Sequence, residues 1–123
     1  MEAGGLGKVY QDGEIIVRQG EVGNAMYVIQ SGKVEVVEDV DGKSVPLAVL
    51  AENDFFGEMA LFEDQVRSAT VRALGTVRVL TVDKKTLLRR IQQDPALAFR
   101  MLEHLCHRVR KLDSELGKIS TAR

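Results

Sequence analysis

The stretch that decides the fold runs Phe55-Phe56-Gly57-Glu58-Met59-Ala60-Leu61-Phe62, Glu63-Asp64-Gln65-Val66, Arg67-Ser68-Ala69-Thr70-Val71-Arg72. Two aromatic residues lead into a Gly-Glu pair, and the apolar run that follows is long enough for about one helical turn. After an acidic loop, the Arg-Ser-Ala step opens an alternating run of the kind that forms half-buried strands. The stretch therefore predicts a strand, a tight turn, a short helix, a loop and a second strand.

Three kinds of group in this stretch can meet around one small ligand. Backbone N–H groups at the start of the short helix attract an anion. The ionised carboxylate of Glu58 can only accept hydrogen bonds, and the guanidinium of Arg67 offers a planar fork that suits a phosphate. A ligand that satisfies all three groups carries one anionic group and one free hydroxyl, and a cyclic nucleoside monophosphate has both.

The stretch resembles the phosphate-binding cassette of the cyclic-nucleotide-binding domain family, in Gly57-Glu58-Met59-Ala60-Leu61 followed by Arg67-Ser68-Ala69-Thr70-Val71. That family includes the bacterial catabolite activator protein, kinase regulatory subunits and nucleotide-gated channels. The resemblance extends from about Tyr10 to about Leu116. It implies a sensor that binds a cyclic nucleotide and transmits the signal through its C-terminal helices. The alternative is a module that keeps the fold for protein docking or dimerisation, which would not need both Glu58 and Arg67.

The resemblance implies a role for each matching position of the cassette. Glu58 would accept a hydrogen bond from the ribose 2′-hydroxyl, and Arg67 would pair with the cyclic phosphate. Gly57 would let the backbone approach the ligand. Further contacts are expected from the start of the short helix and from the residues after the arginine, namely Met59, Ala60, Ser68 and Ala69.

Residues outside the cassette would hold the base. Apolar residues expected on one strand face would line the purine slot, namely Val36, Leu47 and Val49. On the long C-terminal helix, Leu112 and Asp113 would cap the base, and Arg108 would lie near Glu58. Ser68 and Asp113 could read the guanine edge, but an apolar cap suits adenine, which needs fewer polar partners. We therefore expect cAMP to be preferred over cGMP.

Short strands separated by turn residues fill most of the chain up to Val82. They are expected at residues 14–18, 26–29, 33–38, 45–50, 69–73 and 77–82. Asp41-Gly42 predicts a tight hairpin, and Pro46 marks an edge strand or a bulge. The pattern indicates a mainly β fold with C-terminal helices. Its expected parts are a loose N-terminus at 1–9 and a jelly-roll-like β-roll (a double-stranded β-helix) at 10–82 that the cassette at 55–72 interrupts.

The period becomes helical after Val82, and C-terminal helices are expected over residues 83–119. Asp83 predicts the N-cap of the first helix, and Asp94-Pro95 predicts the start of the second. Apolar residues then follow a heptad: Ala98, Leu102, Leu105, Val109, Leu112, Leu116 and Ile119. A period of 3.5 residues favours a partner helix over packing on the chain's own domain. The helix at 95–119 is therefore predicted to form a homodimer.

Composition bounds the remaining possibilities. A chain of 123 residues with 45% hydrophobic content is expected to form one domain, residues 1–123, with a single core. Its net charge of −1 predicts no nucleic-acid contact by this chain itself. The single cysteine, Cys106, leaves no internal disulfide. No apolar run is long enough to span a membrane and no leader opens the chain, so a cytoplasmic setting without membrane contact is expected.

Neither a catalytic site nor a metal site is expected. His104 and His107 are three residues apart on the expected helix, but no third ligand accompanies them. Glu63-Asp64 has no nucleophile and base beside it, which favours solvent-facing charges. We therefore expect a non-enzymatic module whose ligand is cAMP or, less favoured, cGMP.

Overall fold

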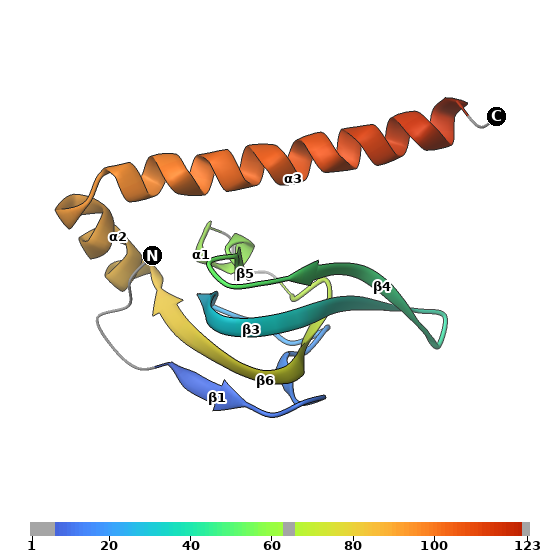
Figure 1. Ribbon diagram of the computed structural model, residues 1–123, viewed down its shortest axis with the longest axis horizontal. Helices are drawn as coiled ribbons and strands as arrows, with labels where there is room; N and C mark the ends of the chain where they lie inside the picture. Colours follow the sequence, from blue (N-terminus) through green and yellow to red (C-terminus); the bar gives the residue numbers. More distant parts are fainter. Residues whose placement is uncertain (1–6, 63–65, 122–123) are drawn as a thin grey trace. The chain divides into compact units, whose positions relative to one another are not determined.

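The computed structural model describes residues 7–62 and 66–121, except for the side chains of Leu112 and of residues 115–121. The chain divides into a strand-rich unit, residues 1–87, and a helical unit, residues 88–123. Its elements in chain order (Figure 1) are β1 (Lys8–Tyr10), β2 (Ile15–Val17), β3 (Ala25–Val40), β4 (Lys43–Leu50), β5 (Phe55–Phe56), α1 (Met59–Phe62), β6 (Thr70–Asp83), α2 (Lys84–Gln93) and α3 (Ala96–Thr121).

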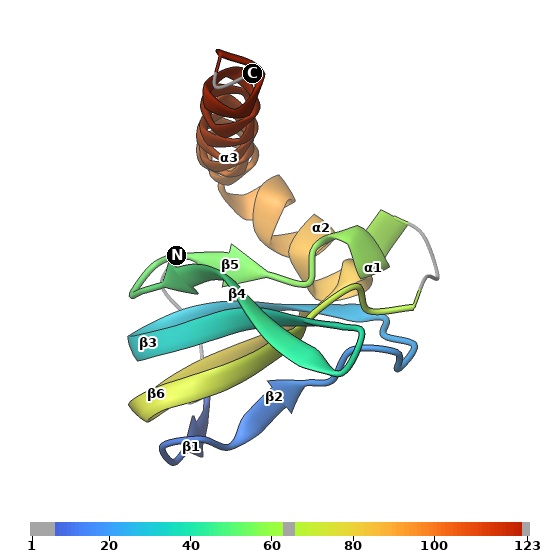
Figure 2. The same ribbon diagram turned by 90° about the vertical axis from the view of Figure 1, so that its right-hand side faces the viewer.

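The strand-rich unit is built on the antiparallel pairing of its two long strands, β3 and β6. β1 and β2 pair with β6, whereas β4 and β5 pair with β3, and all these pairs are antiparallel. Figure 2 shows β3 and β6 side by side, with β1 and β2 beyond β6 and with β4 and β5 beyond β3. The mainly β fold with C-terminal helices that the sequence predicts is therefore confirmed.

Two pairs of expected strands are joined into single long strands. The expected strands at 26–29 and 33–38 are both part of β3, because pairing with β6 continues through register shifts around Ser31. Gly75, between the strands expected at 69–73 and 77–82, lies inside β6 with φ of 73°. Opposite it, Gly32 has φ of 89°, and a Cβ there would lie 2.5 Å from the Thr76 carbonyl oxygen. These glycines bend the paired strands without ending them.

The first strand begins earlier than expected. β1 pairs with β6 from Lys8 onward, inside the segment 1–9 that was expected to be loose. Nη1 of Arg78, on β6, donates to the carbonyl of Gly7 at 3.1 Å. So short a strand carries too little periodicity to be recognised from its residues alone. Residues 1–6 lie outside the described part of the chain.

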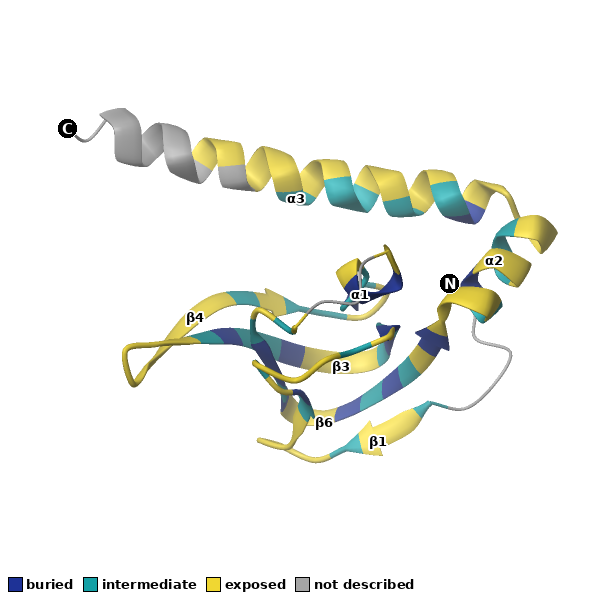
Figure 3. Ribbon diagram, turned by 180° about the vertical axis from the view of Figure 1, so that it is seen from behind, coloured by how far each residue is buried: buried dark blue, intermediate teal, exposed yellow. Residues whose placement is uncertain are grey.

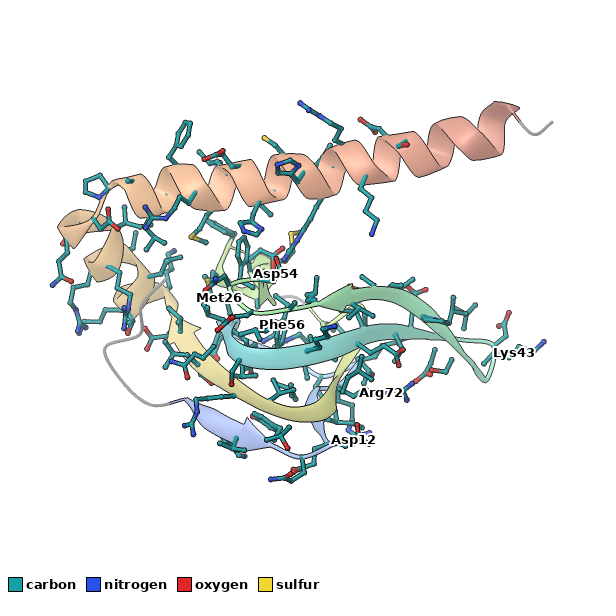
Figure 4. All side chains as sticks on the ribbon, in the orientation of Figure 1. Asp12, Met26, Lys43, Asp54, Phe56 and Arg72 are labelled. Carbon is teal, nitrogen blue, oxygen red and sulfur yellow. The ribbon has the colours of Figure 1, made fainter. Side chains whose placement is uncertain are left out.

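Local turn signals in the β3–β4 hairpin are confirmed. Asp41 and Gly42 have φ of 51° and 78°, the two positive values that a type I′ turn requires. Lys43 follows at the hairpin tip (Figure 4). The register shifts between Val36 and Val37, where Val37 pairs with Pro46. Pro46 therefore lies both at a bulge and on an edge strand, since β3 is the one strand that pairs with β4 among the described residues.

The core of this unit lies along β3 and β6. Figure 3 shows buried positions recurring along both strands. One cluster joins four of the strands, β2, β3, β5 and β6, and consists of Val17, Ile29, Val34, Phe56, Val71, Ala73, Val77 and Val79. Each fully buried aliphatic side chain contributes about 1.5–3 kcal/mol through removal of its surface from water.

Both C-terminal helices begin where the sequence predicts. The Thr86 N–H donates to Oδ1 of Asp83 at 2.7 Å, which caps α2. α3 starts after Asp94-Pro95, and the Leu97 N–H donates to the Asp94 carbonyl at 3.0 Å. The Asp94 carboxylate also accepts from Arg100 at 2.8 Å. None of the described helices is both long enough and apolar enough to cross a bilayer.

The predicted heptad seam on α3 is only partly described. Leu102 and Val109 are 59% and 57% exposed, as a partner-facing seam requires, whereas Ala98 and Leu105 are half-buried. Phe99, which the heptad omits, is 66% exposed. The side chains of the other predicted seam residues lie outside the described part, namely Leu112, Leu116 and Ile119.

Replacing Ile29 with Ala should lower the free energy of unfolding by about 2–5 kcal/mol, because the side chain is fully buried and would leave a cavity. The exposed Val45 offers a control on the neighbouring sheet edge, and Val45→Thr should change stability by no more than about 0.5 kcal/mol. Urea unfolding followed by circular dichroism measures both. Equal losses for the two variants would contradict the assigned core.

Candidate functional site

The cassette folds as its residues predict. Phe55 and Phe56 form β5, which pairs with Val28 and Tyr27 of β3. Gly57 turns the chain with φ of 78°, and α1 follows. Ala60 and Leu61 on α1 are buried and anchor the short helix. The order of strand, turn and short helix is therefore confirmed, and it places Glu58 between the turn and α1.

The first N–H groups of α1 are partly used within the cassette. The Ala60 N–H donates to the Gly57 carbonyl at 3.2 Å, and the Leu61 N–H donates to the Glu58 carbonyl at 3.0 Å. The first of these bonds is at the long end of the normal range. An incoming anion would have to compete with the Gly57 carbonyl for the Ala60 N–H.

The backbone of Arg67 is fixed on the loop between β2 and β3. Its N–H donates to the Glu21 carbonyl at 2.8 Å, and its carbonyl accepts from the Gly20 N–H at 2.9 Å. Beside it, Val66 and Val22 form an isolated antiparallel bridge. The second half of the cassette is thus held against a loop more than forty residues earlier in the chain.

The side chain of Arg67 reaches back to the first half of the cassette. Nη1 donates to the Gly57 carbonyl at 3.1 Å, and Nη2 donates to the Ala25 carbonyl at 2.9 Å. Cζ lies 5.7 Å from the centre of the Tyr27 ring, within cation–π distance. Gly57, Glu58 and Arg67 were predicted to lie close together. Gly57 and Arg67 are in direct contact, and Glu58 is the residue that follows Gly57 in the chain.

Tyr27 has a fixed position under this arginine. Its ring stacks on Phe56, with the centroids 5.1 Å apart and the planes 17° apart. Tyr27 also lies near Tyr10, whose pKa is raised mainly by burial and further by Tyr27 and Glu14. Phe56, labelled in Figure 4, belongs to the core cluster, so it anchors both the cassette and the Tyr27 ring to the core.

The guanidinium groups of Arg67 and Arg72 have different kinds of partner. Nε and Nη2 of Arg72, on β6, both donate to Oε1 of Glu35, at 2.9 Å and 2.5 Å. Arg67 is half-buried, and in the described part of the chain its partners are two carbonyls and one aromatic ring, with no carboxylate among them. Its positive charge is therefore not neutralised by any described side chain.

The remaining predicted cassette residues differ in exposure. Glu58 and Ala69 are half-buried, Ser68 is exposed and Met59 is 64% exposed. Glu58 makes contacts of its own within the fold. Ser68 and Ala69 follow Arg67 directly, so their N–H groups and the Ser68 hydroxyl lie on the segment that leads into β6.

The three residues predicted to line one face of a purine slot do not share that face. Val36 pairs with Ala48 and packs against the core, whereas Val49 pairs with Glu35, so Val36 and Val49 point to opposite sides of the sheet. Leu47 is the additional residue in the bulge and is 53% exposed. The grouping was wrong because register between strands is not encoded in the alternation of either strand.

The predicted capping residues all belong to α3 in the helical unit. Arg108 is half-buried, Asp113 is exposed, and the side chain of Leu112 is not described. Arg108 has contacts within the fold. Their roles at the base stay predictions.

Sequence reasoning missed three residues that hold Arg67. Ala25 contributes only a backbone carbonyl, which no side-chain pattern signals. Tyr27 reads as an ordinary strand residue, and Gly23 reads as a turn glycine although its backbone lies against the guanidinium. Among the described residues, no three His, Cys, Asp or Glu side chains lie together as a metal site requires.

Known proteins are similar to this chain in sequence. The family model of the cyclic nucleotide-binding domain matches residues 7–94. The cAMP-dependent protein kinase regulatory subunit of Schizosaccharomyces pombe is 46% identical over 81 residues, 66% of this chain and 19% of that protein. The cGMP-dependent protein kinase egl-4 of Caenorhabditis elegans is 44% identical over 80 residues, 63% of this chain and 10% of that protein.

A solved structure is similar in fold as well. The crystal structure of the Thermus thermophilus catabolite activator protein aligns with a TM-score of 0.79 and 32% identity, over 92% of this chain and 54% of that one. The chain thus spans only part of each relative. Because the family model covers most of the chain and the fold agrees, the chain belongs to the cyclic nucleotide-binding domain family.

Proposed function

We propose that this chain is a cyclic-nucleotide sensor module that binds cAMP, and cGMP more weakly, at the cassette. The observation that carries the proposal is the Arg67 guanidinium, which lies against the Gly57 carbonyl although ten residues separate the two. A half-buried cation without a described carboxylate partner favours an anionic ligand, because burial makes an uncompensated charge costly.

The cassette offers a partner for each polar part of the nucleotide. A guanidinium has five N–H donors, and two on Arg67 are used on carbonyls, which leaves donors for phosphate oxygens. The Ser68 hydroxyl and the N–H of Ala69 can add to these. Glu58, one residue from Gly57, would accept the ribose 2′-hydroxyl.

The preference for cAMP rests on the expected apolar cap. Adenine presents fewer donors than guanine and needs fewer polar partners. The relatives include both a cAMP-dependent and a cGMP-dependent protein, so family membership leaves the choice of base open.

Signal transmission is proposed to run through α2 and α3, with a homodimer formed by the helix at 95–119. The exposed apolar side chains of Phe99, Leu102 and Val109 support such an interface. They recur three and seven residues apart, as on one face of a coiled-coil helix. A cytoplasmic location, where thiols stay reduced, suits the exposed Cys106.

Calorimetric titration tests the proposal most simply. The purified chain should bind cAMP with a dissociation constant around the micromolar range, about −8 kcal/mol, and cGMP more weakly. Linear 5′-AMP serves as the control because it has the base but not the cyclic phosphate. No heat and no thermal shift with either cyclic nucleotide, after removal of copurified ligand, would leave the docking or dimerisation module as the better interpretation.

Two arginines allow a matched test of the phosphate contact. Arg67→Ala should weaken cAMP binding by about 2–5 kcal/mol, because the phosphate loses its charged partner in a partly dry site. Arg67→Lys should recover only part of the loss, since lysine lacks the planar fork. Arg72→Ala removes the same charge from a residue paired with Glu35 and should leave binding unchanged, at a stability cost of at most about 1 kcal/mol. Equal binding losses for Arg67→Ala and Arg72→Ala would point to a non-specific charge effect.

The dimer is tested on α3 with the exposed Leu102. Leu102→Lys should weaken self-association in sedimentation without unfolding the strand-rich unit, because a charge would be buried in the seam. Glu103→Lys is the matched control on the next residue, since it adds the same side chain outside the heptad. A parent protein that stays monomeric at all concentrations, with and without ligand, would rule the dimer out.

A further inference from the structure

The guanidinium of Arg67 is enclosed more closely than phosphate binding alone requires. A Cβ added to Gly23 would overlap Nε, Nη2 and Cζ of Arg67. A Cβ added to Gly57 would lie 2.7 Å from Nη1. Two glycine backbones therefore approach different nitrogens of the same group, at distances where an added Cβ would displace the guanidinium.

The aromatic side of this enclosure is rigid. The Tyr27 ring lies 5.7 Å from Cζ of Arg67 and stacks on Phe56, its cross-strand neighbour. Phe56 is buried in the core cluster. The ring under the arginine is thus fixed by the fold, independently of any ligand.

Hydrogen bonds fix the remaining freedom of the guanidinium. Nη1 and Nη2 each donate to a different backbone carbonyl, that of Gly57 and that of Ala25. Both acceptors belong to backbone that is anchored by strand pairing or by the cassette turn. The group is therefore restrained in position and in the direction of its donors.

We propose that Gly23 and Tyr27 are positioning residues for the phosphate contact. Together with Gly57 they form a fitted enclosure that holds Arg67 in one orientation before the ligand arrives. The proposal rests on the proposed function and deepens it, because a fixed guanidinium distinguishes the two exocyclic oxygens of a cyclic phosphate. Pre-organisation of this kind improves binding because less side-chain conformational entropy is lost on association.

Gly23 offers a clean variant. Gly23 is not among the glycines with positive φ, so its backbone conformation tolerates alanine. The obstacle to a Cβ is the end of a flexible side chain, so the guanidinium should move while the fold remains. Gly13→Ala is the matched control: Gly13 has φ of 83° with nothing within 4 Å of an added Cβ, so alanine strains the backbone without touching Arg67.

The test measures dissociation constants for cAMP and for the two diastereomers of adenosine 3′,5′-cyclic phosphorothioate, which carry sulfur on one or the other exocyclic position. Gly23→Ala should weaken cAMP binding by about tenfold or more, as loss of a charge-assisted hydrogen bond does, and should bring the diastereomer ratio toward one. Gly13→Ala should lower the melting temperature and leave affinity and ratio unchanged. Tyr27→Leu should behave as Gly23→Ala does, and Tyr27→Phe, which keeps the ring, should restore the parent ratio.

A ligand-free measurement separates this proposal from the proposed function. In the NMR spectrum of the parent, the Nε–Hε signal of Arg67 should be shifted by the Tyr27 ring, and the Nη protons, which donate to carbonyls, should be protected from exchange. Both effects should be lost in Gly23→Ala and kept in Gly13→Ala and Tyr27→Phe. A parent that binds no cyclic nucleotide but shows this signal would overturn the function and keep the enclosure. A Gly23→Ala protein with the parent signal, affinity and diastereomer ratio would overturn the enclosure, whether or not Tyr27→Leu folds.

Discussion

The site depends on one geometric constraint, which is that the paired strands β3 and β6 must curl. Thr70, at the start of β6, pairs with Val37 near the end of β3. Twelve residues separate Val37 from Ala25, about 40 Å if the strand were straight. Yet Arg67, three residues before Thr70, donates to the carbonyl of Ala25. The contact is possible only because the strands bend, with Gly32 and Gly75 providing the bends.

The strand-rich unit holds two arginines whose charges have different partners. On β6, Arg72 is neutralised by Glu35 on the neighbouring strand, which is a structural pairing across the sheet. At the cassette, the described partners of Arg67 are carbonyl oxygens and an aromatic ring, which orient the cation without cancelling its charge. Arg72 thus stabilises the sheet through an ion pair, whereas Arg67 is oriented to bind an anion.

What the sequence could predict follows from how local each signal is. The cassette order, the Asp41-Gly42 hairpin, the bulge at Pro46 and the N-cap at Asp83 all depend on a few adjacent residues, and all are observed. The face shared by Val36 and Val49 depends on register between two strands, and that prediction failed.

Contacts made through backbone are the hardest to predict. The carbonyl of Ala25 has no side-chain signature, and Gly23 matters through the absence of a side chain. The continuity of β3 through Gly32 was also missed, because a glycine that bends a strand and a glycine that ends one are alike in sequence. Residues that act through their backbone or through the absence of a side chain can be recognised only in the folded structure.

The central claim is that Arg67, held by the cassette and by β3, receives the cyclic phosphate. A crystal structure of the protein grown with cAMP tests it most directly. The account predicts a phosphate oxygen within about 3.2 Å of a guanidinium nitrogen of Arg67 and the ribose 2′-hydroxyl on the Glu58 carboxylate. A nucleotide bound elsewhere, or bound at the cassette with its phosphate away from Arg67, would contradict it.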